Sequence, residues 1–345
     1  MNNATIPEPK QLLQKLESDV RSGTWKIIRY FRQNNRDRIP DWCYLPQDDL
    51  IQLVLSNQLL PPHLLIKAIS PMSILSGWRA TQGIYRLNPD LLEKLTKTPY
   101  TGEIPVEALQ LLPEWCVYVE LPEPVTFTGK TFYGFFGTCT ILNGDPQLSL
   151  GWVGEGKTGF EIDGLPLKDT LESSIQHVMN TVVAKRAKTA RGTPFSRLNE
   201  KDRRDLKERF RFALPILIYL GAEKPDIGSH QGDKSLPQKK DRSAIVRKKQ
   251  KVPSPRIWDV GWRRGPAFRK DKEEVQDEAN PITAGSEQSH RPHIRRAHFH
   301  YYWVGSKSEP SGRRLILKWL EPIEVNVHDS SDLVPTVREV KDIHR

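Results

Sequence analysis

The residues most able to do chemistry lie together at positions 291–303. Three of the chain's nine histidines, three arginines and four aromatic residues fall within these thirteen positions. Alternation along an extended strand places His298, His300 and Tyr302 on one face. That face can offer imidazoles and a phenol while the other packs into a core; the packing face comprises Ala297, Phe299, Tyr301 and Trp303.

Four kinds of chemistry fit this strand. His298 and His300, with His293 as a third ligand, could bind a metal ion, because imidazole is a common ligand of transition metals. The same histidines could act as general acids and bases in RNA cleavage, with Arg295 and Arg296 stabilising phosphate charge. They could instead form a recognition surface for a peptide or a nucleic acid. A hydrogen-bonded network that holds the strand to its neighbours is the remaining interpretation, and we favour the recognition surface.

Two other motifs could bind phosphate. Gly151 and the Gly-Lys-Thr at 156–158 have the spacing of a nucleotide-binding phosphate loop. Such a loop should open a helix, whereas residues 160–164 have no helical periodicity, so we do not expect nucleotide binding. The basic segments at 239–242 and 247–251 could contact RNA or the ribosome, or could form a solvated linker.

Composition limits the class of protein. The 345 residues carry a net charge of +10 and an isoelectric point of about 9.4, which favours polyanionic partners such as RNA, DNA or ribosomal surfaces. The spacing of Cys43, Cys116 and Cys139 matches neither a zinc site nor a disulfide framework, so we expect buried thiols in a reducing compartment. The N-terminus lacks a signal-peptide pattern, and no stretch reaches about 18 apolar residues, the length of a membrane span. A cytoplasmic protein is therefore expected.

Apolar residues at helical spacing predict a mainly helical N-terminal half. Ser22-Gly23 marks a break, Pro61-Pro62 a helix start, and Asn88-Pro89 a helix cap. Helices return after the middle of the chain, and the last of these ends in an apolar segment that predicts burial on all sides. The expected helices cover residues 8–35, 47–58, 61–76, 89–96, 104–112, 168–187 and 200–220.

Runs of β-branched and aromatic residues between turn residues predict strands. Asn143-Gly144-Asp145 is a strong hairpin signal, so the strands around it should form an antiparallel meander. The polar segment at 306–313 fits the connection of a second hairpin. The expected strands cover residues 115–120, 131–142, 148–153, 256–262, 296–305, and 315–320 with a continuation to 323–327.

These elements predict an α+β fold in which a helical N-terminal half packs on a mainly antiparallel β-sheet, joined by the last hairpin. We expect an N-terminal helical segment at 1–60 and a single α+β core at 61–326. Flexible, disordered charged inserts are expected at about 228–254 and 264–288, because these stretches have few residues that could form a core. Residues 327–345 should form a polar tail.

Several short segments occur in the order and at the approximate spacing of a known family, from about residue 70 to 326. They comprise Gly77-Trp78-Arg79, Gly83-Ile84-Tyr85, residues 112–119, residues 223–227, Arg291 to Arg296, His298, His300, Tyr302-Trp303, Gly305, Trp319 and Val325-Asn326. Together they resemble the type V-A anti-CRISPR family that blocks biogenesis of the type V-A CRISPR effector nuclease, with its relatives on mobile genetic elements.

The resemblance implies an inhibitor that recognises the N-terminal nascent peptide of a target effector and causes loss of its mRNA and protein. Its partners would be that peptide and the ribosome or mRNA, without a membrane; it implies no catalytic residue, metal or cofactor. The alternatives are an RNA-binding protein or metal-independent ribonuclease using His293, His298 and His300, and a DNA-binding regulator. The residues predicted to bind are His293, Arg295, Arg296, His298, His300, Tyr302, Trp78 and Arg79.

Overall fold

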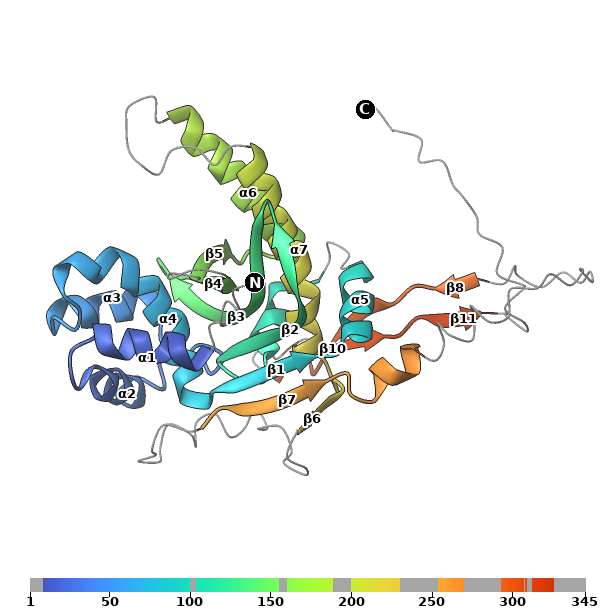
Figure 1. The fold of residues 1–345 in the computed structure, drawn as a ribbon, viewed down its shortest axis with the longest axis horizontal. Coiled ribbons are helices and arrows are strands. Elements are labelled where there is room, and N and C mark those ends of the chain that lie inside the picture. The colour runs from blue at the N-terminus through green and yellow to red at the C-terminus, as the bar shows by residue number, and fades with distance from the viewer. Residues whose placement is uncertain are drawn as a thin grey trace, which may run out of the picture.

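The centre of the molecule is a seven-stranded mixed sheet with the strand order β5-β4-β3-β2-β1-β7-β6 (Figure 1). The computed structural model describes residues 9–99, 104–154, 160–188, 200–229, 254–269, 293–306, 308 and 312–325. The strands of this sheet are β1 (Gly83–Leu87), β2 (Cys116–Phe127), β3 (Lys130–Leu142), β4 (Asp145–Gly154), β5 (Phe160–Pro166), β6 (Ile227–Ser229) and β7 (Arg256–Val260).

Most strand pairs in this sheet are antiparallel, as predicted. β2 to β5 form a meander, β1 lies parallel to both β2 and β7, and β6 is antiparallel to β7. The hairpin predicted at Asn143 and Gly144 is confirmed: both have positive φ, 54° and 79°. This is the left-handed backbone that a tight hairpin turn needs and that Asn and Gly adopt most readily. β1, β5 and β6 are strands of this sheet that the sequence analysis did not identify.

The N-terminal helices cover one face of the sheet. Gly23, with a φ of 87°, separates the first two helices where the sequence predicted a break. Ile28, Leu50 and Met72 come from three different helices and are fully buried in one core with Tyr118 of β2. This layer contains α1 (Pro9–Asp19), α2 (Thr24–Asn34), α3 (Gln47–Ser56), the 3₁₀ turn η1 (Pro62–Leu64) and α4 (Leu65–Thr81).

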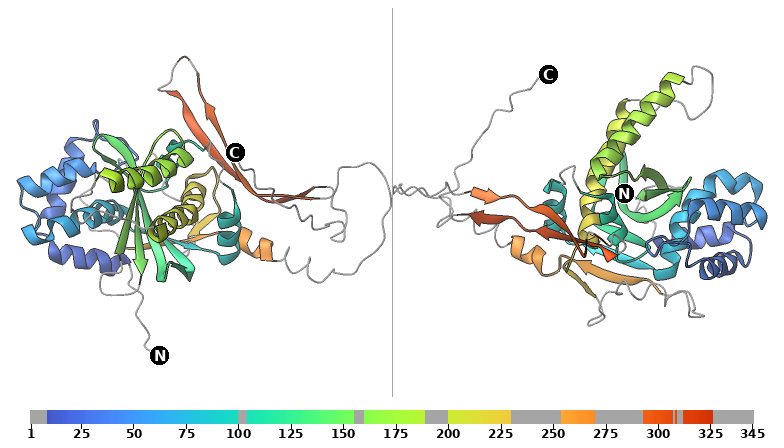
Figure 2. Two further views of the ribbon diagram at one scale, coloured as in Figure 1. Left: turned by 90° about the horizontal axis from the view of Figure 1, so that it is seen from above. Right: turned by 180° about the vertical axis from the view of Figure 1, so that it is seen from behind.

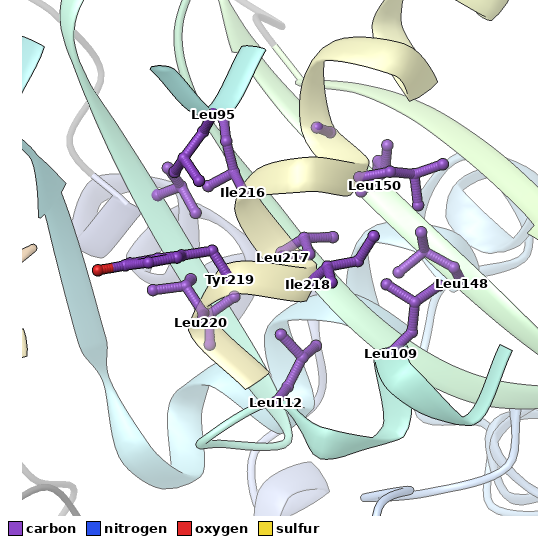
Figure 3. Close-up of a cluster of buried hydrophobic side chains, with 14 of the residues drawn as sticks. Leu95, Leu109, Leu112, Leu148, Leu150, Ile216, Leu217, Ile218, Tyr219 and Leu220 are labelled. Atoms are coloured by element: carbon purple, nitrogen blue, oxygen red, sulfur yellow. The ribbon is translucent and has the colours of Figure 1, made fainter. Parts of the chain in front are cut away.

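A second helical layer covers the opposite face. Figure 3 shows the apolar end of its longest helix against Leu148 and Leu150 of β4. A Cβ atom on Gly137 of β3 would lie 2.7 Å from Leu217, so a glycine there lets the helix approach the sheet closely. Burial on both faces explains the nearly continuous apolar runs of β2 and β3. The layer contains α5 (Pro89–Lys97), η2 (Val106–Leu111), α6 (Leu171–Lys188) and α7 (Glu200–Gly221).

The prediction that the last hairpin joins the main sheet is wrong. β9 (His298–Val304) and β10 (Arg314–Leu320) form a separate two-stranded sheet, which we call the ribbon. Beyond it, β8 (His293–Arg295) pairs with β11 (Ile323–Val325), and Figure 2 shows these strands extending away from the body. The ribbon attaches through side chains packed on the second helical layer, so backbone pairing with the sheet is not needed.

Most of the two predicted charged inserts, residues 230–253 and 270–288, lies outside the described residues. The predicted tail lies outside them as well. The starts of both predicted inserts differ from expectation. Gly228 and Ser229 belong to β6 and pair with β7, residues 264–269 form a helix, and Phe268 is buried. Phe268, an apolar residue in a charged stretch, is thus part of the hydrophobic core. The division at residue 60 stays a prediction. Among the described residues, no helix is both long and apolar enough to cross a membrane.

The three cysteines are buried free thiols, as predicted. Burial raises the pKa of Cys43 to about 12, although hydrogen bonding to Thr140 and the nearby Arg32 act in the opposite direction. Burial also raises the pKa of Cys116 well above its ordinary value. Because the thiolate is the reactive form, neither side chain is suited to nucleophilic chemistry.

Candidate functional site

The ribbon has two faces, as its sequence predicted, but Trp303, which the alternation placed on the packing face, is 38% exposed. In the antiparallel register, Phe299 pairs with Trp319 and Tyr301 with Leu317. Phe299, Leu317 and Trp319 are buried, and Tyr301 is half-buried. These side chains form the inner face, which packs against the body.

Trp319 holds the inner face in place. Its indole packs edge-on against Tyr219 of α7, with ring centroids 5.4 Å apart, and against Phe268 at 6.2 Å. Its Nε1 donates a hydrogen bond of 3.3 Å to Oγ1 of Thr98, and the guanidinium of Arg264 lies 5.5 Å from the ring centroid. One residue therefore connects the ribbon to three separate segments of the body.

The outer face carries three of the eight predicted binding residues, His298, His300 and Tyr302. His300 is exposed, and its ring lies 6.0 Å from that of Tyr302. On the neighbouring strand, Lys318 lies opposite His300, with its Nζ 5.5 Å from the centroid of Tyr302. Hydrogen bonding to Tyr302, aided by the negative charge of Glu223, raises the pKa of Lys318. This face combines the positive charge of Lys318 with the rings of His300 and Tyr302, and the half-buried His298 lies on the same face.

The remaining predicted residues of this region lie at the far end of the ribbon. His293 pairs with Val325 in the β8–β11 ladder, and Arg295 pairs with Ile323. The side chains of Arg295 and Arg296 are exposed, and the carbonyl oxygen of Arg296 lies 3.3 Å from Nδ1 of His298. The chain thus passes from one ladder to another between His293 and His298.

The metal and acid–base hypotheses need those histidines to converge. The described part of the chain contains no group of three or more His, Cys, Asp or Glu side chains placed to hold a metal ion. His298 and His300 share a face, whereas His293 belongs to the next ladder. An acid–base role for the pair stays a prediction.

Trp78 and Arg79 lie elsewhere, at the C-terminal end of α4. Trp78 is completely buried, donates from Nε1 to the carbonyl oxygen of Gly83 at 2.9 Å, and packs on Phe136. Arg79 pairs with Glu17 at 2.9 Å and lies over the ring of Trp25. The structure does not bring these two residues together with the ribbon, and Trp78 has no exposed surface to offer a ligand.

A groove of about 540 Å³ lies along β10, on a side of the ribbon that sequence reasoning did not identify. Its volume is within the range of sites that hold small molecules or peptide side chains. Five separate segments of the chain build it: Asp41 and Trp42; Glu107, Gln110 and Leu111; Gly221, Ala222 and Glu223; Trp303; and residues 313–317.

Aromatic and apolar side chains provide contact area in the groove. Trp303 is 38% exposed, and the guanidinium of Arg313 stacks over it at 5.4 Å. Trp42 is half-buried and packs against the cores on both faces of the sheet. The sequence signals were the proline-framed turn around Trp42 and the aromatic character of Trp303. Neither signal could show that the two residues line one groove.

The groove is polarised. Asp41, Glu107 and Glu223 line it, together with Arg313 and Arg314 at the start of β10. Nε of Arg313 is enclosed and has no hydrogen-bond partner among the described residues. The groove can therefore offer carboxylates to a cation and the positive charge of two arginines to an acceptor.

Known proteins resemble this chain over most of its length. Protein FinQ from Escherichia coli is 26% identical over 281 residues, covering 76% of this chain and 79% of FinQ. The crystal structure of AcrVA2 matches the fold with a TM-score of 0.56 at 20% identity, covering 92% of this chain and 97% of that one. Residues 85–327 match the family described as AcrVA2-like, the anti-CRISPR type V subtype A2 family. This match includes the sheet, α7, the ribbon and most of the groove, and the chain therefore belongs to the AcrVA2-like family of anti-CRISPR proteins.

Proposed function

We propose that this protein inhibits a type V-A CRISPR effector by recognising the N-terminal nascent peptide of that effector and causing loss of its mRNA and protein. Membership of the anti-CRISPR family supports the target class. The observation that carries peptide recognition is the groove along β10, because aromatic walls and separated charges suit an extended peptide. The expected partners are the nascent peptide and the ribosome or mRNA in the cytoplasm.

A co-expression experiment tests this function. The protein is produced in bacteria together with a type V-A effector nuclease, and effector protein and mRNA are both measured. Three versions of the effector are compared: the native start, the same peptide from synonymous codons, and a different peptide at the start. We expect loss of protein and mRNA for the first two versions only.

The synonymous version separates peptide recognition from mRNA recognition. If it escapes while the native version is lost, the protein reads the nucleotide sequence and the peptide hypothesis is wrong. Loss of all three versions, or of none, would also contradict it. An unrelated reporter mRNA in the same cells controls for general toxicity.

RNA binding, with or without cleavage, is the second candidate function. The grouping of His300, Tyr302 and Lys318 on the outer face favours it, because cations beside an aromatic ring suit single-stranded nucleic acid. Purified protein is incubated with end-labelled RNA, with and without a chelator. Cleavage that survives the chelator and is lost in the double variant His298→Ala, His300→Ala would establish the ribonuclease and displace the binding-only proposal.

A further inference from the structure

One edge of β10 is partly open toward the groove. Leu317 accepts a hydrogen bond at 2.6 Å from the backbone N–H of Glu223, which lies outside the ribbon. In an antiparallel pair, backbone groups of alternate residues point to the same side of the strand. The N–H and C=O of Leu315 must therefore point toward this side too, away from β9. Within the described part of the chain, no hydrogen bond fills these two positions.

The open edge and the groove coincide. Consecutive residues 313–317 line the groove, which is the arrangement expected when a strand borders it with its edge. Opposite them, α7 ends at Gly221, and Ala222 adds only a methyl group. A Cβ atom on Gly221 would lie 3.1 Å from Leu111, so the glycine lets α7 end close to η2 at the border of the groove. A free strand edge next to an open groove is the geometry that receives an added strand.

The charged residues of the groove favour peptides of a particular charge. Asp41, Glu107 and Glu223 line the groove, and the C-terminal end of α7 adds the negative end of a helix dipole. The guanidinium groups of Arg313 and Arg314 line the groove beside the start of β10. A peptide with a lysine or arginine near the carboxylates and a carbonyl group near Arg313 would satisfy both.

We propose that the groove binds an extended peptide that adds as a third strand to the free edge of β10. The occupant carries apolar side chains at alternate positions, for contact with Trp42 and Trp303, and a lysine or arginine at the carboxylate side. This inference rests on the proposed function in taking a peptide as the ligand. It adds the site, the backbone pairing and the charge of the ligand.

A random peptide display library tests the groove without assuming any effector. Peptides enriched on the wild-type protein are synthesised with acetylated N-termini, and their affinities are measured by fluorescence anisotropy. We expect basic peptides with alternating apolar residues. N-methylation of every second backbone amide should abolish binding, whereas methylation of the intervening amides should leave it nearly unchanged, because only alternate N–H groups face β10.

Groove variants locate the bound peptides. Trp303→Ala and the double variant Glu107→Gln, Glu223→Gln should each weaken binding by about tenfold or more. The matched control is Trp262→Ala, because Trp262 is also exposed and also has an arginine stacked on it, at 5.2 Å, but does not line the groove. Equal affinity for wild type and groove variants would overturn the inference, as would uniform tolerance of N-methylation or no enrichment on wild type over the groove variants.

A second copy of the chain could also occupy the edge, and sedimentation velocity tests this. A wild-type dimer that Trp303→Ala dissociates, and with which the peptides compete, would replace the peptide as occupant. A final measurement uses the acetylated N-terminal peptide of the effector. If library peptides bind the groove but the effector peptide does not, the strand-addition site stands and the proposed function fails. If the effector peptide binds wild type and groove variants equally, the proposed function stands and this site fails.

Discussion

The main sheet and the ribbon use the same kind of residue in different ways. In β3, Phe135 packs into the core on one face and Phe136 into the core on the other, and both are fully buried. In β9, Phe299 is buried, but the next residue, His300, is exposed. A strand covered on both faces uses its side chains for packing, whereas a strand covered on one face leaves half of them free for contacts. Candidate binding residues therefore concentrate in the ribbon.

The two regions should also differ in stability. Trp152 of β4 packs against several aromatic rings, and its Nε1 donates to Asp163 at 2.8 Å. The ribbon depends on far fewer buried side chains, with Trp319 at the centre of its attachment. Loss of one large side chain from the main sheet should therefore lower the stability of the whole molecule. Loss of one from the ribbon should mainly weaken the attachment of the ribbon to the body.

The largest loss of stability is expected from a substitution in the main sheet. Trp152→Ala should lower the free energy of unfolding by about 3–5 kcal/mol, because it leaves a large cavity and removes one of the partners of the buried Asp163, which keeps its ion pair with Arg209. Urea denaturation followed by circular dichroism measures this change. Trp152→Phe, which keeps a ring but removes the N–H, is the matched variant and should cost less. Equal costs for the two variants would mean that cavity formation is not the main effect.

The second largest loss of stability is expected in the ribbon, where it should stay local. Trp319→Ala should cost about 2–3 kcal/mol, concentrated in the ribbon, because the indole connects β10 to Tyr219, Phe268 and Thr98. Hydrogen exchange should become faster in β9 and β10 and change little in β3 and β4. Uniform acceleration across the sheet would show that ribbon and body unfold as one cooperative unit.

The third prediction concerns how stability depends on pH through Asp163, which lies in the body. Burial raises the pKa of Asp163 from 3.8 to about 6, although Arg209 and the hydrogen bond from Trp152 oppose the shift. Between pH 4 and 6 the folded protein therefore holds this proton more tightly than the unfolded chain, so its contribution to stability falls as pH rises. The change should be on the order of 1–3 kcal/mol.

The variant Asp163→Asn tests this direction. Denaturation of both proteins from pH 4 to 7 should give a difference, wild type minus variant, that falls with rising pH. Other carboxylates titrate in both proteins and cancel in the difference. A difference that stays constant, or that rises with pH, would contradict the raised pKa of Asp163.

The smallest expected effect on stability is at the exposed end of the ribbon. Trp303→Ala should change the free energy of unfolding by less than about 1 kcal/mol, because the side chain is 38% exposed and contacts mainly Arg313. Thermal denaturation beside Trp262→Ala gives the comparison. A large loss would assign Trp303 to packing and remove it as a specific probe of the groove.

Local pattern was enough to predict much of the fold. Helix caps and breaks at Gly23 and Asn88, and the turn at Asn143-Gly144, depend on backbone preferences of single residues and appear where expected. The alternation correctly separated the inner and outer faces of β9 from His298 to Tyr301, whereas Trp303, assigned to the packing face, is exposed near the end of the strand. The resemblance of short segments also identified the family. These features depend on neighbours in the sequence, which a single chain displays directly.

What only the tertiary structure decided is which surfaces meet. Alternation in β9 showed that one face would be buried, but not that Trp319 would attach the ribbon to α7 instead of extending the main sheet. The groove combines Trp42, Glu107, Glu223 and Arg313, which are far apart in the sequence. Contacts of this kind depend on how distant elements pack, and packing depends on the shapes of all the surfaces together. The sequence thus determined the elements and their polarity, and the fold determined where a ligand could lie.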